Sequence, residues 1–168
     1  MTTVTRFPSP VGELILTASE TALTAVYFPT SRHGPPPDVP PLRDAKRGPG
    51  GEVLARTRDQ LSEYFAGTRT SFDLPLDPRG TPFELSVWKE LRAIPYGVTR
   101  SYSDIARRLG DPRSTRAIGA ANGKNPIPII VPCHRVIGAH GELTGFGGGI
   151  DRKRWLLEHE GALLPLKG

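Results

Sequence analysis

Cysteine is almost missing from this sequence, since Cys133 is the only one among its 168 residues. A single cysteine excludes a disulfide within the chain, and a free thiol is typical of a reducing compartment. Structural zinc needs four ligands, commonly several cysteines, so no metal site is expected. The histidines show no spacing typical of metal ligands either: His33, His134, His140 and His159.

Long apolar runs are missing too, and nothing approaches the roughly 20 residues of a membrane span. Residues 1–7 carry no basic cluster followed by an apolar stretch, so no signal peptide is expected. The sequence therefore predicts a cytoplasmic protein without a membrane partner.

The second half of the chain lacks a balancing number of acidic residues. Residues 1–80 hold nine Lys/Arg and nine Asp/Glu, whereas residues 81–168 hold thirteen and eight, so the whole net charge of +5 lies there. This asymmetry favours a polyanion as partner of the second half. It is a weak signal alone, because many basic surfaces are simply solvated.

Residues 1–78 predict a small domain of sheet and helix. Alternating apolar residues between turn signals predict three strands in a meander, at 3–7, 12–18 and 22–28. Proline and glycine are so dense over 30–50 that an exposed, mobile loop is expected, and a proline-rich ligand for a partner domain is the less favoured interpretation. A helix over 52–66 and a returning strand over 71–76 complete the pattern.

A linker over 77–80 leads to a mainly helical domain, 81–168. Two capping boxes, Thr81 with Glu84 and Ser101 with Asp104, predict helix starts. Five glycines within 141–149 predict a turned loop, after which Asp151 is expected to cap the last helix.

Two short helices, joined by a connector at 111–113, predict a helix-turn-helix. The second helix, 114–122, is nearly all alanine and glycine after Arg116. Small side chains offer few hydrogen bonds to base edges, so this helix suits sequence-independent binding through phosphates. An ordinary helical hairpin remains the alternative on this pattern alone.

Cys133 lies beside His134, directly after an apolar run with three prolines. A thiol reacts as the thiolate, and a neighbouring base is the usual arrangement of an activated nucleophile. For an arbitrary Cys-His pair, an inert buried cysteine is the more common case. The surrounding motifs reverse that weighting.

Residues 132–136, Pro-Cys-His-Arg-Val, resemble the active-site signature of the alkylguanine-DNA alkyltransferases, a family of direct-reversal DNA repair proteins. Arg116, Asn125-Pro126, the glycine-rich loop and residues 155–161 resemble the same family in order and spacing. The similarity is specific over 81–161 and looser over 1–80. It implies an α/β (α+β) protein, in which a ribonuclease-H-like domain precedes a winged-helix-like domain that binds DNA.

The resemblance implies that the Cys133 thiolate takes the alkyl group from O6-alkylguanine in DNA. His134 resembles the residue that accepts the thiol proton through a water, Glu160 the carboxylate that orients this histidine, and Asn125 the residue that braces the turn. Because the thioether product is stable, each molecule acts once, as a methylated-DNA–protein-cysteine S-methyltransferase. The reaction needs no cofactor and no metal.

The implied partner is double-stranded DNA, from which the damaged nucleotide is flipped out. Tyr102 resembles the tyrosine that rotates this nucleotide and contacts the base, and Arg116 the finger that fills its place in the stack. The other residues expected to bind DNA or substrate are Ser114, Asn122, Arg135, Val136, Phe146 and Gly147. We expect a monomer in solution, and leave open whether molecules cluster on DNA and whether O4-alkylthymine is repaired.

Three positions depart from familiar members of the family. Phe146 stands where a tyrosine is often found, Gly147 where some members have serine, and Asn122 where some have a bulkier residue. These differences concern the range of substrates rather than the reaction. Some members also hold zinc in the N-terminal domain, but its cysteine ligands are missing here.

Two other functions fit parts of the pattern. A module that only flags alkylated DNA has no use for the thiol of Cys133. A cysteine hydrolase built on Cys133, His134 and Glu160 needs an oxyanion hole and has no role for a helix-turn-helix. The alkyltransferase uses all of these features.

Overall fold

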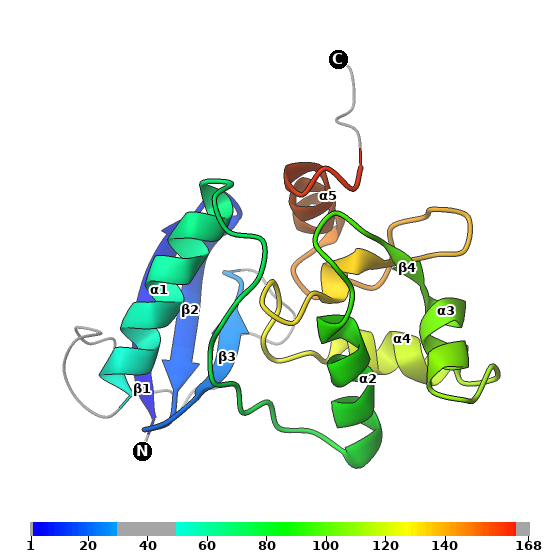
Figure 1. The fold of residues 1–168 in the computed structure, drawn as a ribbon, viewed down its shortest axis with the longest axis horizontal. Coiled ribbons are helices and arrows are strands. Elements are labelled where there is room, and N and C mark those ends of the chain that lie inside the picture. Colours follow the sequence, from blue (N-terminus) through cyan, green and yellow to red (C-terminus); the bar gives the residue numbers. More distant parts are fainter. Residues whose placement is uncertain (1, 30–49, 164–168) are drawn as a thin grey trace. The chain divides into compact units, whose positions relative to one another are not determined.

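A computed structural model describes residues 2–29 and 50–163 of the chain. The chain divides into two compact units, Met1–Arg79 and Gly80–Gly168 (Figure 1). The first contains a small sheet and a helix and the second is mainly helical, which confirms the predicted α/β (α+β) class. The loop predicted over 30–50 lies outside the described residues, except for Gly50.

The first unit is a three-stranded antiparallel sheet in the order β1-β2-β3, with one helix packed on it (Figure 1). Its elements match the predicted ranges to within two residues: β1 Thr3–Ser9, β2 Gly12–Ala18, β3 Leu23–Tyr27 and α1 Gly51–Phe65. Leu14 and Leu16 of β2 and Leu54 and Leu61 of α1 are fully buried. The alternation of apolar residues thus places one face of the sheet against the helix.

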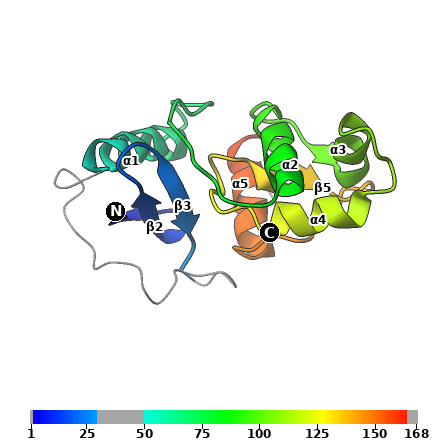
Figure 2. The same cartoon turned by 90° about the horizontal axis from the view of Figure 1, so that it is seen from below.

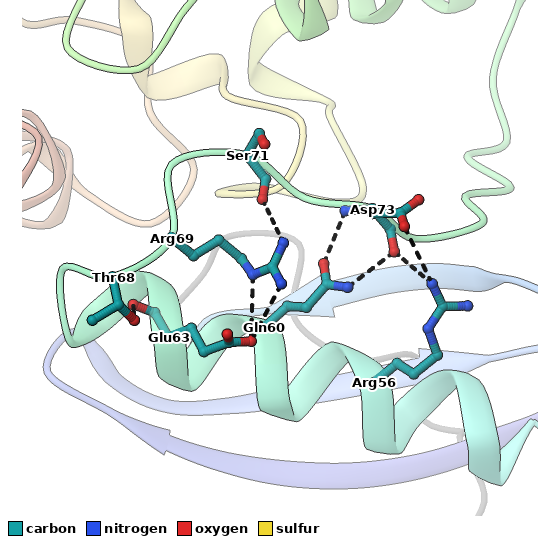
Figure 3. Close-up of polar contacts among 7 residues, drawn as sticks. All are labelled: Arg56, Gln60, Glu63, Thr68, Arg69, Ser71 and Asp73. Atoms are coloured by element: carbon teal, nitrogen blue, oxygen red, sulfur yellow. Dashed lines mark hydrogen bonds and ion pairs between the residues drawn. The ribbon is translucent and has the colours of Figure 1, made fainter.

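The chain after α1 returns beside the helix and is fastened to it by side chains (Figure 3). The Gln60 amide donates to the Asp73 carbonyl (3.0 Å) and accepts from the Asp73 N–H (2.9 Å). Arg56 donates to the same carbonyl (2.8 Å), and Arg69 donates to the Ser71 carbonyl (3.0 Å). The strand predicted over 71–76 is therefore wrong except for one bridge, from Leu76 to Leu23, because Arg56 and Gln60 of the helix occupy the backbone groups of Asp73.

The second unit holds the remaining elements: α2 Pro82–Arg92, β4 Arg100–Ser101, α3 Tyr102–Arg108, α4 Thr115–Gly123, the 3-10 turn η1 Cys133–Arg135, β5 Val136–Ile137 and α5 Ile150–His159. Both predicted capping boxes are present, at the starts of α2 and α3. The predicted cap of the last helix is wrong. Gly149, with φ 93°, occupies that position, and Asp151 lies within the first turn, where its charge favours the helix dipole.

Helices α3 and α4 pack against each other and both contact α2 (Figure 2). The indole N–H of Trp88 in α2 donates to the Ala121 carbonyl of α4 (2.8 Å), which ties the two helices together. Strands β4 and β5 pair in parallel, Arg100 with Val136 and Ser101 with Ile137. This pair brings the start of α3 next to the residues that follow Cys133.

No helix in residues 2–29 or 50–163 is long and apolar enough to cross a membrane.

Candidate active site

Cys133 lies on a tight turn that the preceding apolar run builds. Residues 127–136 are buried, and Cys133 itself is 4% exposed. Ile129 has φ 74°, a conformation that a β-branched residue rarely adopts. The Cys133 N–H donates to the Val131 carbonyl (2.8 Å), and η1 begins at Cys133. The tight packing around this turn holds the sulfur in one place.

Two asparagines brace the turn from α4 and the residues after it. Asn125 donates to the Val131 carbonyl (2.8 Å) and accepts from the Ile127 N–H (3.1 Å). Asn122, buried in α4, donates to the Cys133 carbonyl (3.3 Å). Asn122 therefore links the second helix of the helix-turn-helix to Cys133. It does not face solvent, so its expected DNA contact is not a surface contact in this structure.

His134, Arg135 and Glu160 form a buried network that begins at the residue after Cys133. His134 Nε2 lies 2.8 Å from Glu160 Oε2, and the Arg135 guanidinium donates to both Glu160 oxygens (2.8 and 3.0 Å). A third Arg135 bond reaches the Ile94 carbonyl (2.7 Å). Glu160 closes α5 as its C-cap residue, so the network joins that helix to η1.

The network sets the protonation states of its members. Burial alone would raise the pKa of Glu160, but the hydrogen bonds from His134 and Arg135, and their charges, hold it well below its usual range. Burial lowers the pKa of His134, although the hydrogen bond and the charge of Glu160 act to raise it. His134 is therefore neutral at pH 7, its Nε2–H donates to Glu160, and Nδ1 has no hydrogen-bond partner among the described residues.

The structure buries two neighbours of His134 that were expected to bind DNA or substrate. Arg135 was expected to contact DNA, but it is 6% exposed and its guanidinium is taken up by Glu160 and Ile94. Val136 is fully buried. The ion pair with the buried Glu160 carboxylate holds the Arg135 guanidinium in the interior. The side chains of Arg135 and Val136 therefore do not form part of a surface in this structure.

Lys153 is a charged group at the site that the sequence analysis missed. It is fully buried, and its ammonium donates to the Val136 carbonyl (2.6 Å) and the Thr144 carbonyl (2.8 Å). A signal was present in the sequence, because Lys153 shares helical spacing with Leu156 and Leu157, the buried residues of α5. A lysine on an apolar stripe is rare enough to mark a functional position.

Tyr102 opens α3 and is partly buried against the glycine-rich loop. Its hydroxyl donates to the Thr144 carbonyl (3.1 Å). A Cβ on Gly145 would lie 3.3 Å from that hydroxyl, so the missing side chain lets the loop approach closely. Phe146 is partly exposed and Gly147 exposed on the same loop. Burial raises the pKa of Tyr102, which keeps the phenol protonated at neutral pH.

The expected DNA finger, Arg116, is exposed in the first turn of α4, and Ser114 immediately precedes this helix and is partly exposed. Gly119 lies on the side of α4 that faces Tyr102, and a Cβ there would be 3.9 Å from the ring. The structure thus places Tyr102 between α4 and the glycine-rich loop. Arg116 and Tyr102 belong to the two helices of the helix-turn-helix.

The fold and the site together define a class of protein. A thiol, a neutral histidine and a buried carboxylate lie beside a helix-turn-helix, which indicates a protein that uses cysteine chemistry on DNA.

Comparisons with known proteins identify the family within this class. Residues 3–78 match the ribonuclease-like domain, and residues 82–162 the DNA binding domain, of 6-O-methylguanine DNA methyltransferase. The methylated-DNA–protein-cysteine methyltransferase of Mycobacterium tuberculosis (strain ATCC 25618 / H37Rv) is 50% identical over 163 residues, covering 94% of this chain and 91% of the relative. The chain belongs to the 6-O-methylguanine DNA methyltransferase family.

A more distant relative and a solved structure agree. The methylated-DNA–protein-cysteine methyltransferase of Methanosarcina acetivorans is 46% identical over 156 residues, covering 93% of this chain and 96% of the relative. A crystal structure of Mycobacterium tuberculosis OGT in complex with DNA has a TM-score of 0.81 and 47% identity, covering 95% of this chain and 92% of that one. The likeness therefore extends over both units of the chain.

Proposed function

We propose that Cys133 is the acceptor in the reaction of this family, the repair of DNA by transfer of an alkyl group from O6 of guanine to a cysteine. The observation that carries the proposal is the position of this thiol, which is buried beside the His134–Glu160–Arg135 network in the unit with the helix-turn-helix. A sulfur nucleophile suits attack on a saturated carbon, and the thioether that forms has no route back to a thiol in this site.

His134 is the proposed base. Burial raises the pKa of the Cys133 thiol, while the side chain of Asn125 and the charge of Lys153 lower it. The thiol is thus largely protonated when DNA arrives, and its proton must be removed. Nδ1 of His134 accepts it through a water, because adjacent side chains diverge and direct transfer is disfavoured. Glu160 stabilises the imidazolium that results.

The transfer step balances with Tyr102 as the acid. The sulfur lone pair forms the S–C bond, the C–O6 bond breaks, and its electrons remain on guanine. The Tyr102 hydroxyl, protonated at neutral pH, donates a proton to this anion, and the proton held by His134 then passes through solvent to the Tyr102 phenolate. The products are S-alkylcysteine and unmodified guanine. Each molecule therefore reacts once, and the step requires no cofactor.

DNA is the proposed partner of the face that carries α4. Arg116 is exposed and can replace a flipped nucleotide in the stack through its planar guanidinium, while Ser114 lies beside it. The small residues of α4 read few base edges, which supports binding without sequence preference. We infer a monomer that binds DNA through one face. Whether molecules cluster along DNA is left to duplex-binding assays, and whether O4-alkylthymine is repaired is left to measurements of intact mass.

A DNA substrate and a lone free thiol support a cytoplasmic site of action.

Intact mass tests the proposal directly. The protein is incubated with a duplex that carries one O6-methylguanine, with Cys133→Ser and an unmodified duplex as controls. We expect a gain of one methyl group, saturating at one per protein and mapping to the peptide with Cys133. Binding of the duplex without a mass change would contradict the proposal and favour a module that only flags damage.

A further inference from the structure

Three arginines that alkyl transfer does not use line open hollows beside α3. One hollow has a volume of about 530 Å³ and is lined by Arg100 of β4 and by Asp104, Arg107 and Arg108 of α3. A second, of about 500 Å³, shares Arg100, Asp104 and Arg107 and extends to the turn that follows β5. Together they are named the arginine hollow.

Carboxylates offset only part of the positive charge there. Asp104 accepts from the Ser101 N–H (2.9 Å) and from Arg107, and these bonds, with the charge of Arg107, hold the pKa of this carboxyl below its usual range. Arg108 lies 4.0 Å from Glu90, a weak contact at the surface. Three guanidinium groups against the one carboxylate that lines the arginine hollow therefore leave it positive.

Several hydrogen-bond donors in the arginine hollow are unused. Among the described residues, the Arg100 guanidinium bonds only to the carbonyl of its neighbour Thr99 (3.1 Å), and the Ser103 hydroxyl, which also lines the hollow, has no partner. The Arg107 side chain is 63% exposed and binds Asp104 through one nitrogen. An arginine has five N–H donors, so both guanidinium groups can bind a further anion. Guanidinium and hydroxyl groups are the usual donors to phosphate oxygens.

A duplex that lies on α4 also reaches the arginine hollow. In a helix-turn-helix the second helix enters the groove and the first, here α3, crosses the backbone. Ser103 follows Tyr102, and a Cβ on Gly119 of α4 would meet the ring of that tyrosine at 3.9 Å. The helix α3 has seven residues and is about 10 Å long, so its cations remain close to the helix that faces DNA.

We propose that the arginine hollow binds one backbone phosphate of the duplex, held by Arg100, Arg107 and the Ser103 hydroxyl. The proposal rests on the proposed function, in which the helix-turn-helix binds DNA, and it adds a contact outside α4. A phosphate contact fixes the position of a protein on the strand without reading sequence. This agrees with the small side chains of α4, which read few base edges.

Arg100→Gln and Arg107→Gln test the proposal, singly and together, because glutamine keeps a hydrogen-bonding amide and removes the charge. Arg58→Gln, in α1 of the first unit, is the matched control for loss of an exposed arginine. Duplex affinity is measured by fluorescence anisotropy at a series of salt concentrations, in a Cys133→Ser background. We expect the double variant to bind about tenfold more weakly at low salt, and the slope of log affinity against log salt to become shallower by about 1. The control should keep the native slope.

A scan of the duplex separates a single phosphate seat from a diffuse positive field. Each phosphate near the lesion is replaced in turn by an uncharged methylphosphonate. Several replacements should weaken binding of the Cys133→Ser parent. At one of these positions the loss should disappear in the double variant, and at the others it should remain. A double variant that responds to every replacement as the parent does, or that keeps the native salt slope, would overturn the proposal.

Two further arms keep the outcomes distinct. If the changes at Arg100 prevent folding, the exposed Arg107 decides: we expect Arg107→Gln to bind about threefold more weakly, and native affinity would overturn the proposal. Calorimetry with inorganic phosphate covers a free anion as the occupant, since loss of phosphate binding with native duplex affinity would also overturn it.

Failure of the proposed function is recognised separately. If the wild-type protein gains no methyl group from the duplex, that function fails, while the binding measurements on the Cys133→Ser series still decide the phosphate seat. If it gains one and the arginine variants bind the duplex like their parent, only the phosphate seat fails.

Discussion

Among the described residues, both units have ion pairs at the surface, but only the second unit also buries charged side chains. In the first unit the ion pairs lie at the surface: the side chains of Arg69 and Glu63 are 27% and 48% exposed. In the second unit the side chains of His134 and Glu160 are 0% exposed and that of Arg135 is 7% exposed. Lys153 is buried beside them.

This difference indicates that the second unit gives up folding stability in order to hold charged groups at the candidate site. Surface pairs contribute about 0–1 kcal/mol each, and α1 would hold its sheet without them. A buried pair costs more in lost hydration than an apolar packing of the same volume, so it is weak evidence for stability. The buried charges of the second unit instead fix a neutral histidine next to Cys133 in the chain.

The largest effect is expected at the reacting atom. Cys133→Ser should abolish methyl transfer, since the alkoxide that attack would require is far less accessible than a thiolate. Duplex binding should persist, because the sulfur is buried and α4 is untouched. Intact mass and anisotropy measure the two properties, and transfer to any other residue in this variant would sink the assignment.

Glu160→Gln sharpens the contrast between buried and exposed pairs. The change leaves Arg135 as a buried charge without its anion, which should lower the free energy of unfolding by about 3–5 kcal/mol. Glu63→Gln, the matched change in the exposed pair, should cost less than about 1 kcal/mol. Urea denaturation compares the variants, and equal losses would show that the two pairs do not differ as the structure indicates.

The same carboxylate predicts a dependence of stability on pH. Its pKa is lowered by folding, so its contribution is fully present above the unfolded value of 4.5 and is lost as the pH falls below it. Wild type should therefore lose stability toward acid more steeply than Glu160→Gln. Denaturation at a series of pH values between neutral and about 3 measures this, and parallel curves would contradict the role of Glu160.

Arg116→Ala probes the exposed side of the second unit. If the guanidinium replaces the flipped nucleotide, the variant should repair a duplex at least about tenfold more slowly, since flipping costs a few kcal/mol. Reaction with free O6-methylguanine needs no flipping and should stay within about twofold of wild type. Equal losses on both substrates would show that Arg116 does not act as a wedge.

The smallest effect is expected in the first unit. Gln60→Ala removes both bonds to the Asp73 backbone, which should cost about 1–2 kcal/mol and leave the rate of methyl transfer unchanged. Gln60→Glu keeps the acceptor and should retain part of that stability. A loss of transfer in either variant would mean that the first unit contributes to the chemistry.

The sequence predicts local features well because they depend on near neighbours. The capping boxes at Thr81 and Ser101, the sheet of the first unit and α1 follow from spacing and turn residues alone. The returning strand over 71–76 was wrong because Gln60 binds the Asp73 backbone, a contact that a local pattern does not contain. The cap at Asp151 was wrong because Gly149, two residues earlier and with a positive φ, takes that position.

The motifs around Cys133 were sufficient to identify the family, because they depend on short-range sequence order, and the comparisons confirm it. That Cys133 is the nucleophile stays a prediction. Only the tertiary structure decided that Arg135 turns inward to Glu160 and that Lys153 lies against the Thr144 carbonyl. The partners of these cations lie on other elements of the fold. A charge enters the interior only where folding brings it a partner, and the sequence order does not show which partner that is.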